Sequence, residues 1–332
     1  MRCGALVRPL CGDDIQTMNL TNFLCVLLLV VVGGMIALAQ PSRAAPVSQS
    51  ETIRTPDGRR TYYMVRPART VPNGTTYPIV VMLHGGYGNG KNMANATGIE
   101  SYVAESGFIA VFPNASRNHW NDGRSTTADG PDDVAFISRV VADVAERFGG
   151  DPARAFVAGM SNGGMLTHRL ACEAPNAFRA FATVTANIPE DLYSACTPTV
   201  PVPIVMFAGT DDELMPYNGG AIPRSRLFGG KGGNVISAAA TFEVYRTLDG
   251  CSGQTSSALP DTENDGTTVT RITGTGCSDE LAVELYRIDG GGHTWPGSEG
   301  RRGPLARRML GQTSYDIEAT DIIVDFFRNY GL

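Results

Sequence analysis

Basic residues are outnumbered by acidic residues in this chain of 332 residues. Lysine and arginine number 27 against 33 aspartates and glutamates, so the formal net charge is −6 and the sequence pI is near 5.3. Proteins that bind nucleic acid need a basic patch to neutralise phosphates. The acidic balance argues against nucleic acid as a partner, and no run of like charges suggests an interaction tail.

Cysteine pairs at zinc-binding spacing are missing too. No Cys-x-x-Cys occurs, which makes zinc a weak alternative for the cysteines. Four cysteines remain outside the first 39 residues, and four allow three disulfide pairings. Pairing neighbours in sequence, Cys172 with Cys196 and Cys251 with Cys277, closes two loops of similar length, each worth about 3 kcal/mol in the loop-entropy model. This usage indicates an oxidising compartment.

Charged residues are absent from the apolar run at residues 23–39. Ala37-Leu38-Ala39 satisfies the small-x-small rule for signal peptidase, so residues 1–39 are predicted to be a signal peptide and residues 40–50 a linker. A second possible cut follows Ala45. The other alternative is an uncleaved membrane anchor, although about 17 residues is the lower limit of a spanning helix. We expect an extracellular or periplasmic protein without stable membrane association after cleavage.

Internal repeats and low-complexity segments are also absent, and apolar strand-like runs alternate with helix-compatible segments. A hairpin is expected at 51–65. Strands are expected at 79–83, 108–112, 155–158, 181–185, 204–208, 269–273 and 281–288, and helices at 99–105, 132–148, 162–173, 237–248 and 316–330. This alternation predicts an α/β fold, a mostly parallel central sheet with helices on both faces, in one domain over residues 51–332.

A serine between glycines follows the strand predicted at 155–158. Gly159, Ser161 and Gly163 fit the pattern Gly-x-Ser-x-Gly of the nucleophile elbow, in which a strand turns sharply into a helix. A side chain at either glycine position would collide with the neighbouring strand or helix. The start of the helix directs N–H groups toward any oxyanion formed there. Ser161 is therefore the predicted nucleophile.

Histidine is scarce, with four residues in the chain, so the base that a catalytic serine needs can be sought by elimination. His84 precedes two glycines and is predicted to shape an oxyanion loop. His168 lies two turns along the helix after the serine and is predicted to be structural. His119 is expected in a surface or cleft loop. His293 follows three glycines at the end of the last predicted strand and is the best candidate for the base.

The carboxylate that orients this base should lie between the serine and the histidine, as it does in α/β-hydrolases. Asp211, Asp212 and Glu213 share one predicted strand end, and their spacing leaves the choice among them open. One oxyanion-hole N–H is expected from Asn162, directly after the nucleophile, and the other from the turn after His84, at Gly86.

Four segments resemble the secreted esterase family that groups polyhydroxybutyrate depolymerases with feruloyl and acetylxylan esterases. They are Leu83-His84-Gly85-Gly86, Gly159-Met160-Ser161-Asn162-Gly163, Gly209-Thr210-Asp211-Asp212-Glu213-Leu214-Met215-Pro216-Tyr217 and Gly291-Gly292-His293-Thr294-Trp295-Pro296-Gly297. Family members typically read Gly-Thr-x-Asp-x-x-Val-Pro-Tyr in the third segment, so the resemblance selects Asp212, with Met215 in place of the valine. The fourth segment selects His293.

The resemblance covers roughly residues 51–330 and looks closest to the small single-domain members. It implies that Trp295 lines the substrate cleft. Trp120, in a predicted loop near the site, is a second candidate for substrate binding. The closely spaced cysteines of the family fit the pairing of neighbours given above.

The resemblance also implies the α/β-hydrolase fold and two-step acyl transfer on Ser161, a chemistry that requires no metal or organic cofactor. Expected substrates are feruloyl or acetyl esters of plant polysaccharides, or hydroxyalkanoate esters. A serine peptidase on the same fold and a non-catalytic carbohydrate-binding relative are the alternatives. We expect no substrate-binding module after the last predicted helix, which favours soluble, oligomeric or hemicellulose-bound esters over a solid polymer surface.

Overall fold

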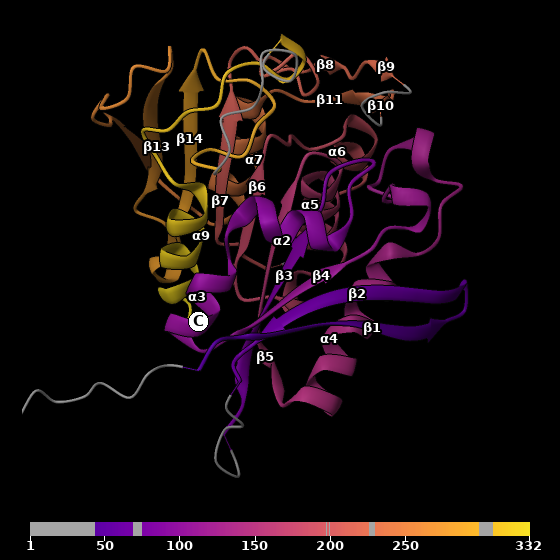
Figure 1. The fold of residues 1–332 in the computed structure, drawn as a ribbon. Coiled ribbons are helices and arrows are strands. Elements are labelled where there is room, and N and C mark those ends of the chain that lie inside the picture. The colour runs from indigo at the N-terminus through magenta and orange to yellow at the C-terminus, as the bar shows by residue number, and fades with distance from the viewer. Residues whose placement is uncertain (1–43, 69–74, 197, 199, 226–229, 299–307) are drawn as a thin grey trace, which may run out of the picture. The chain divides into compact units, whose positions relative to one another are not determined.

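The uninterrupted apolar runs form the centre of a ten-stranded sheet in the computed structural model (Figure 1). The structure describes residues 44–68, 75–196, 198, 200–225, 230–298 and 308–332, so the signal peptide predicted at 1–39 lies outside the described residues. β3 (Tyr77–Leu83) and β4 (Ile109–Pro113) are buried at every position except Tyr77. Such continuous apolar sequences are typical of strands that are covered on both faces.

The sheet has the order β1-β2-β4-β3-β5-β6-β7-β14-β13-β12 over the described ranges. The central strands from β4 to β14 pair in parallel, and antiparallel strands extend both sides. The other strands of the sheet are β1 (Val47–Thr55), β2 (Gly58–Arg66), β5 (Gly150–Met160), β6 (Phe181–Val184), β7 (Ile204–Gly209), β12 (Gly253–Ala258), β13 (Thr268–Thr275) and β14 (Val283–Asp289). Two short antiparallel pairs join β8 (Gly220–Ala221) to β11 (Asn234–Val235) and β9 (Arg224–Ser225) to β10 (Gly230–Lys231). The predicted mostly parallel sheet is confirmed.

The first strand begins earlier than the predicted linker allows. β1 pairs with β2 from Val47, opposite Arg66, to Thr55, opposite Gly58. Residues 47–50, expected to be linker, therefore belong to the sheet. The linker prediction was wrong there because it used composition alone, whereas β2 offers hydrogen-bonding partners over its whole length.

Three of the helices begin where the sequence supplies a capping side chain. Asn89 caps α2 by accepting from the N–H of Asn92. Asp132 caps α4 by accepting from the N–H of Ala135, and Ser237 caps α7 by accepting from the N–H of Ala240. The helices are α2 (Gly90–Thr97), α3 (Glu100–Ser106), α4 (Asp133–Phe148), α5 (Asn162–Glu173), α6 (Glu190–Ala195), α7 (Ala238–Leu248) and α9 (Ala319–Arg328). The sequence reading missed α2, because its glycine and asparagines have low helix propensity.

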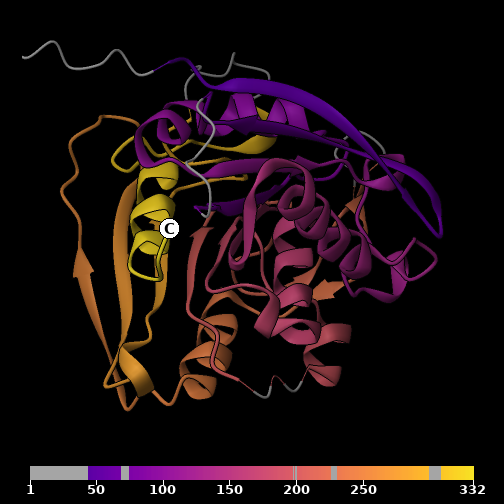
Figure 2. The same cartoon turned by 90° about the horizontal axis from the view of Figure 1, so that it is seen from below.

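Helices cover both faces of the sheet (Figures 1 and 2). An apolar cluster that includes Phe136 of α4 and Leu166 of α5 also joins α6 and α7 to one face. A second cluster, with Met93 of α2 and Phe327 of α9, joins α2, α3 and α9 to the other face. α3 and α9 lie side by side in Figure 1 and are joined by the hydrogen bond from Tyr102 to Asp321. The sheet is therefore the middle of three layers.

Two disulfides join neighbouring cysteines of the sequence, in the pairing expected above. Cys172 in the last turn of α5 is bonded to Cys196 after α6. Cys251 after α7 is bonded to Cys277 after β13. Within the described part of the chain, no helix has the length and apolar character that a membrane crossing requires.

Candidate active site

Four of the parallel strands bring the predicted site residues to one edge of the sheet. The loops after β3, β5, β7 and β14 carry Gly86, Ser161, Asp212 and His293, in that order. Parallel strands end at the same edge, so groups far apart in the sequence converge there. The sheet therefore supplies the scaffold for a site made of loop residues.

Ser161 lies on the turn between β5 and α5 in a strained backbone conformation, with φ 54° and ψ −122°. The flanking glycines allow close packing around it. A Cβ on Gly159 would lie 2.3 Å from the carbonyl oxygen of Gly163, and a Cβ on Gly163 would lie 2.5 Å from that of Leu83. The turn thus has the geometry of a nucleophile elbow, with the serine at its tip.

His293 and Asp212 form a buried hydrogen-bonded pair. Nδ1 of His293 lies 2.7 Å from Oδ2 of Asp212, and the two side chains are 9% and 1% exposed. Oδ1 of the same carboxylate accepts from the N–H groups of Leu214 and Met215, at 2.9 and 2.8 Å. With the Nδ1 proton directed at the carboxylate, Nε2 is the basic nitrogen of the imidazole.

The loops that carry Asp212 and His293 are also joined through the backbone. The N–H of Asp211 donates to the carbonyl oxygen of Gly291, at 2.9 Å. A Cβ on Gly209 would lie 2.2 Å from that same oxygen, so only glycine permits this approach of the two strand ends. The distance between base and carboxylate is thereby set by the pairing of β7 with β14.

Ser161 and His293 line two pockets together. The α5-side pocket also contains Gly86, His119, Arg124, Asn162, Met165, Leu214, Met215, Ile222 and Pro223. The α2-side pocket, of about 330 Å³, also contains His84, Gly85, Gly86, Gly88, Asn89, Asn92, Met93, Ala96, Met160, Leu214 and Leu310. Serine and histidine therefore face shared space on both sides of the elbow. No three His, Cys, Asp or Glu side chains of the described residues are grouped so that they could hold a metal ion.

Gly86 and Asn162 flank the serine, as expected of oxyanion-hole donors. Asn162 is the first residue of α5, and the N–H at this position has no partner within a helix. Gly86 lines both pockets. A Cβ on Gly85 would lie 3.9 Å from Oγ of Ser161, which shows how closely the turn after β3 approaches the elbow. The turn after β3 and the start of α5 therefore both border the serine.

His84 supports that turn from within. Its Nδ1 lies 2.7 Å from the carbonyl oxygen of Gly85, and its Nε2 accepts the N–H of Ala115 at 3.1 Å. Burial lowers the pKa of His84 to about 4, so the ring is neutral near pH 7. The imidazole thus holds the turn through two hydrogen bonds, in agreement with the role predicted for it.

Four buried polar side chains around Asn162 were not predicted from the sequence. We call them the Asp122 cluster (Asp122, Arg124, Thr127 and Asn162). Nδ2 of Asn162 donates to Oδ2 of Asp122 at 2.5 Å. Arg124 donates to both oxygens of that carboxylate, and Thr127 donates to Oδ1 at 2.8 Å. All four side chains are less than 5% exposed. The cluster fixes the residue that supplies the N–H beside Ser161. No motif signals it, because Asn162 is remote in sequence from the loop that carries the other three members.

The two tryptophans do not line the cleft in the way predicted. Trp295 is 1% exposed, belongs to the apolar cluster under α9, and donates its indole N–H to Thr320 at 3.1 Å. The prediction for Trp295 was wrong, because closeness to His293 in sequence does not determine which way the side chain points. Trp120 is fully buried and donates its indole N–H to the carbonyl oxygen of His84, at 2.8 Å. It supports the oxyanion turn, and it borders a further pocket described below.

Comparison with known proteins relates the chain to esterases. Residues 64–202 match the family model described as esterase PHB depolymerase. The putative esterase NocK of Nocardia uniformis subsp. tsuyamanensis is 29% identical over 266 residues, which cover 78% of this chain and 76% of that protein. Feruloyl esterase B of Piromyces equi is 25% identical over 65% of this chain, and the alignment spans 39% of that protein. The solved structure of acetyl xylan esterase from Aspergillus awamori is similar to this one with a TM-score of 0.47 and 15% sequence identity. The match covers 74% of this chain and 94% of that chain.

The family model confirms the resemblance over residues 64–202, which include the first two of the four segments, at residues 83–86 and 159–163. The order of the strands and the helices on both faces are those expected for an α/β-hydrolase. The chain is an ester-hydrolysing enzyme with the α/β-hydrolase fold, and its residues 64–202 carry the signature of the esterase family named after polyhydroxybutyrate depolymerase.

Proposed function

We propose that the protein is a serine carboxylesterase that works through an acyl-enzyme on Ser161. The observation that carries this proposal is the 2.7 Å contact between His293 and Asp212 beside a serine at the tip of an elbow. A serine hydroxyl is a poor nucleophile near neutral pH unless an oriented base removes its proton. Asp212 orients that base and stabilises its protonated form.

The reaction has two matching halves. Nε2 of His293 takes the proton of Ser161 as Oγ bonds to the ester carbonyl carbon. The carbonyl oxygen becomes an oxyanion and accepts hydrogen bonds from the N–H groups of Gly86 and Asn162. His293 then protonates the alcohol oxygen as the ester C–O bond breaks. Water attacks the acyl-enzyme in the same way, which releases the acid and restores the serine.

The proposed substrates are feruloyl or acetyl esters of plant polysaccharides, or hydroxyalkanoate esters of the polyhydroxybutyrate type. Support comes from the family description and from relatives named feruloyl esterase and acetylxylan esterase. The α2-side pocket suits an acyl group, because its wall includes the apolar side chains of Met93, Met160 and Leu310. The other polar side chains of this lining, besides Ser161 and His293, are those of His84, Asn89 and Asn92.

We also propose that the protein is exported. The two disulfides support export, because such bonds persist in oxidising compartments. The leader-like sequence at residues 1–39 supports it as well.

The test uses the chain from Gln40 onward with methyl ferulate, acetylated xylan and a trimer of 3-hydroxybutyrate. We expect turnover of at least one ester, and covalent labelling of Ser161 by a fluorophosphonate. Ser161→Ala should abolish both signals, whereas Ser138→Ala, on the exposed face of α4, should change neither. Full activity of the Ser161→Ala protein would disprove the mechanism, and turnover of amides but no ester would indicate a peptidase.

A further inference from the structure

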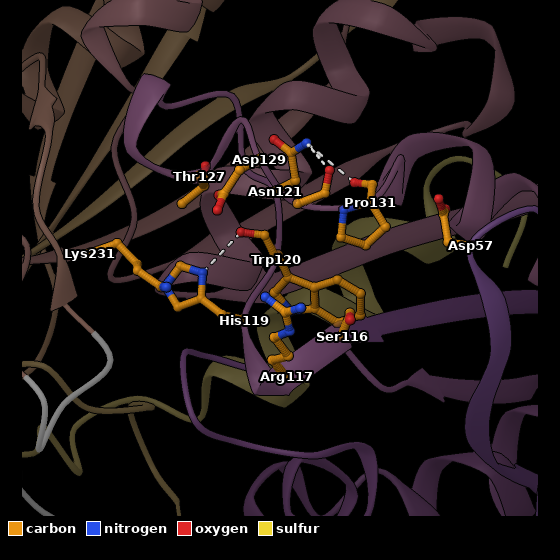
Figure 3. A pocket seen from close by; sticks show the side chains of 11 residues that line it. Asp57, Ser116, Arg117, His119, Trp120, Asn121, Thr127, Asp129, Pro131 and Lys231 are labelled. Carbon is orange, nitrogen blue, oxygen red and sulfur yellow. Dashed lines mark hydrogen bonds between the residues drawn. The ribbon is translucent and has the colours of Figure 1, made fainter.

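A polar pocket of about 300 Å³ shares His119 with the α5-side pocket of the candidate active site. Figure 3 shows the side chains that line it. Four separate stretches of the chain form it: the β1–β2 turn, residues 116–121, residues 127–131, and β10. Its charged lining side chains are Asp57, Arg117, Asp129 and Lys231. All four are exposed, so they line an open pocket at the surface.

The lining selects for a neutral ligand that both donates and accepts hydrogen bonds. Two carboxylates and two cations balance in charge, which disfavours a polyanion. Ser116, Asn121 and Thr127 add hydroxyl and amide groups. Sugar hydroxyls are donors and acceptors at once, so a carbohydrate matches this mixture. An aromatic acyl group does not, because the only aromatic ring of the lining besides His119 is the fully buried Trp120.

Two links connect this pocket to the reacting groups. His119 lines it and also lines the α5-side pocket beside Ser161 and His293. Its neighbours Arg117 and Asn118 have positive φ values of 51° and 57°. The carbonyl oxygen of Asn118 accepts the N–H of Tyr87, at 2.7 Å, directly after Gly86. Strain of this kind in non-glycine residues is concentrated at functional sites.

We propose that this pocket is a carbohydrate subsite, which binds sugar residues on the alcohol side of the ester while Ser161 attacks the carbonyl. This subsite presupposes the proposed ester hydrolysis. It specifies where the sugar part of the substrate binds. The alcohol side extends past His119 into the polar pocket, and the acyl group occupies the α2-side pocket with its apolar wall. Asp129 and Lys231 bind sugar hydroxyls through charge-assisted hydrogen bonds.

The test compares the double variant Asp129→Ala/Lys231→Ala with the matched double variant Arg139→Ala/Asp261→Ala. Each removes one exposed cation and one exposed carboxylate, and the second pair borders none of the three pockets described above. The substrates are an acetylated xylo-oligosaccharide and p-nitrophenyl acetate, which has no sugar. The subsite variant should lose about tenfold in kcat/KM on the oligosaccharide, through KM, and stay within roughly twofold on p-nitrophenyl acetate.

The matched variant should behave as the native protein on both substrates. Equal losses on the two substrates, or unchanged KM for the oligosaccharide, would overturn the subsite and leave ester hydrolysis standing. A native protein that hydrolyses neither ester would overturn the proposed function, and the subsite with it. Titration of Ser161→Ala with unesterified xylotetraose gives a second measurement, in which Asp129→Ala/Lys231→Ala should weaken binding to a similar degree.

Discussion

Two buried histidines lie near the serine helix α5 in different surroundings. His293 shares its Nδ1 proton with the carboxylate of Asp212 and opens onto two pockets. His168, within α5, is 1% exposed and lies between the hydroxyl of Tyr245, at 2.8 Å, and the carbonyl oxygen of Ala186, at 3.3 Å. Burial lowers the pKa of His168 to about 4.

The hydrogen-bond partner of a buried histidine therefore determines whether the ring can act as a base. With the Ala186 carbonyl as acceptor, Nε2 of His168 carries the proton and Nδ1 accepts from Tyr245, so the ring is satisfied as a neutral group. A carboxylate partner stabilises the imidazolium, which a general base must become. The four predictions below test this contrast, in descending order of expected effect.

Removing the carboxylate from the His293 pair should have the largest effect. Asp212→Asn should lower kcat by about 10⁴-fold, because the amide no longer stabilises the imidazolium or the correct tautomer. Measured with p-nitrophenyl acetate, Asp211→Asn is the matched control, since Asp211 is exposed and adjacent. Similar rates for the two variants would refute the assignment of Asp212.

The Asp122 cluster is a third buried group, and its carboxylate holds the side chain of Asn162, the residue proposed to contact the oxyanion. Asp122→Asn leaves the buried guanidinium of Arg124 without its counter-charge, so the free energy of unfolding should fall by about 3 kcal/mol. In the folded protein, kcat should fall about tenfold with KM unchanged, because the N–H of Asn162 is no longer held in place. Urea unfolding and steady-state kinetics measure the two effects. The exposed carboxylate change Asp129→Asn should alter neither quantity for p-nitrophenyl acetate, and an unchanged kcat in Asp122→Asn would disprove the positioning role.

Acid should destabilise the fold through the neutral histidines. The folded-state pKa values of His84 and His168 are about 4, below the usual 6.5, so the unfolded chain binds more protons between these values. Their stabilising contribution is complete above pH 6.5 and is lost as the pH falls toward 4. We expect native protein to lose about 2 kcal/mol or more over this range in denaturant titrations. His168→Phe should flatten the profile, and an equally steep profile in that variant would contradict the assignment.

The buried carboxyl of Asp249 should make the protein less stable as the pH rises, which is opposite to the effect of the histidines and smaller. Burial raises the pKa of Asp249 to about 6, and its Oδ2 has no hydrogen-bond partner among the described residues. The folded protein therefore binds this proton more tightly than the unfolded chain, and stability decreases as the pH rises from 3.8 through 6. Asp249→Asn should raise the free energy of unfolding by about 1–2 kcal/mol at pH 8 and by little at pH 4. A gain that is the same at both pH values would point to packing instead.

The residues of the candidate site could be predicted from the sequence only in part. Ser161, Asp212 and His293 could be predicted as site residues because each stands in a contiguous motif at the end of a predicted strand. The Asp122 cluster escaped, because Asp122 and Asn162 lie 40 positions apart and meet only when the loop after β4 packs on the elbow. Trp295 was misjudged for a related reason, since a motif gives position along the chain and not the direction of a side chain.

Some helices and strands could likewise be predicted from the sequence, and others could not. Long apolar runs predicted the central strands, because a strand that is buried on both faces has an unmistakable composition. The edge strand β12 has only exposed or half-buried residues and was not foreseen. α2 was missed as well, because it is held by its cap at Asn89 and by burial of Met93 more than by helix propensity.

The two disulfides have a consequence for the order in which the chain can mature. Their cysteines are 24 and 26 positions apart, and the two loops do not overlap. A polypeptide that emerges from its N-terminus presents Cys172 and Cys196 before Cys251 appears. Of the three possible pairings, the observed one is therefore the pairing that oxidation during vectorial emergence favours, and neither bridge has to wait for a distant segment.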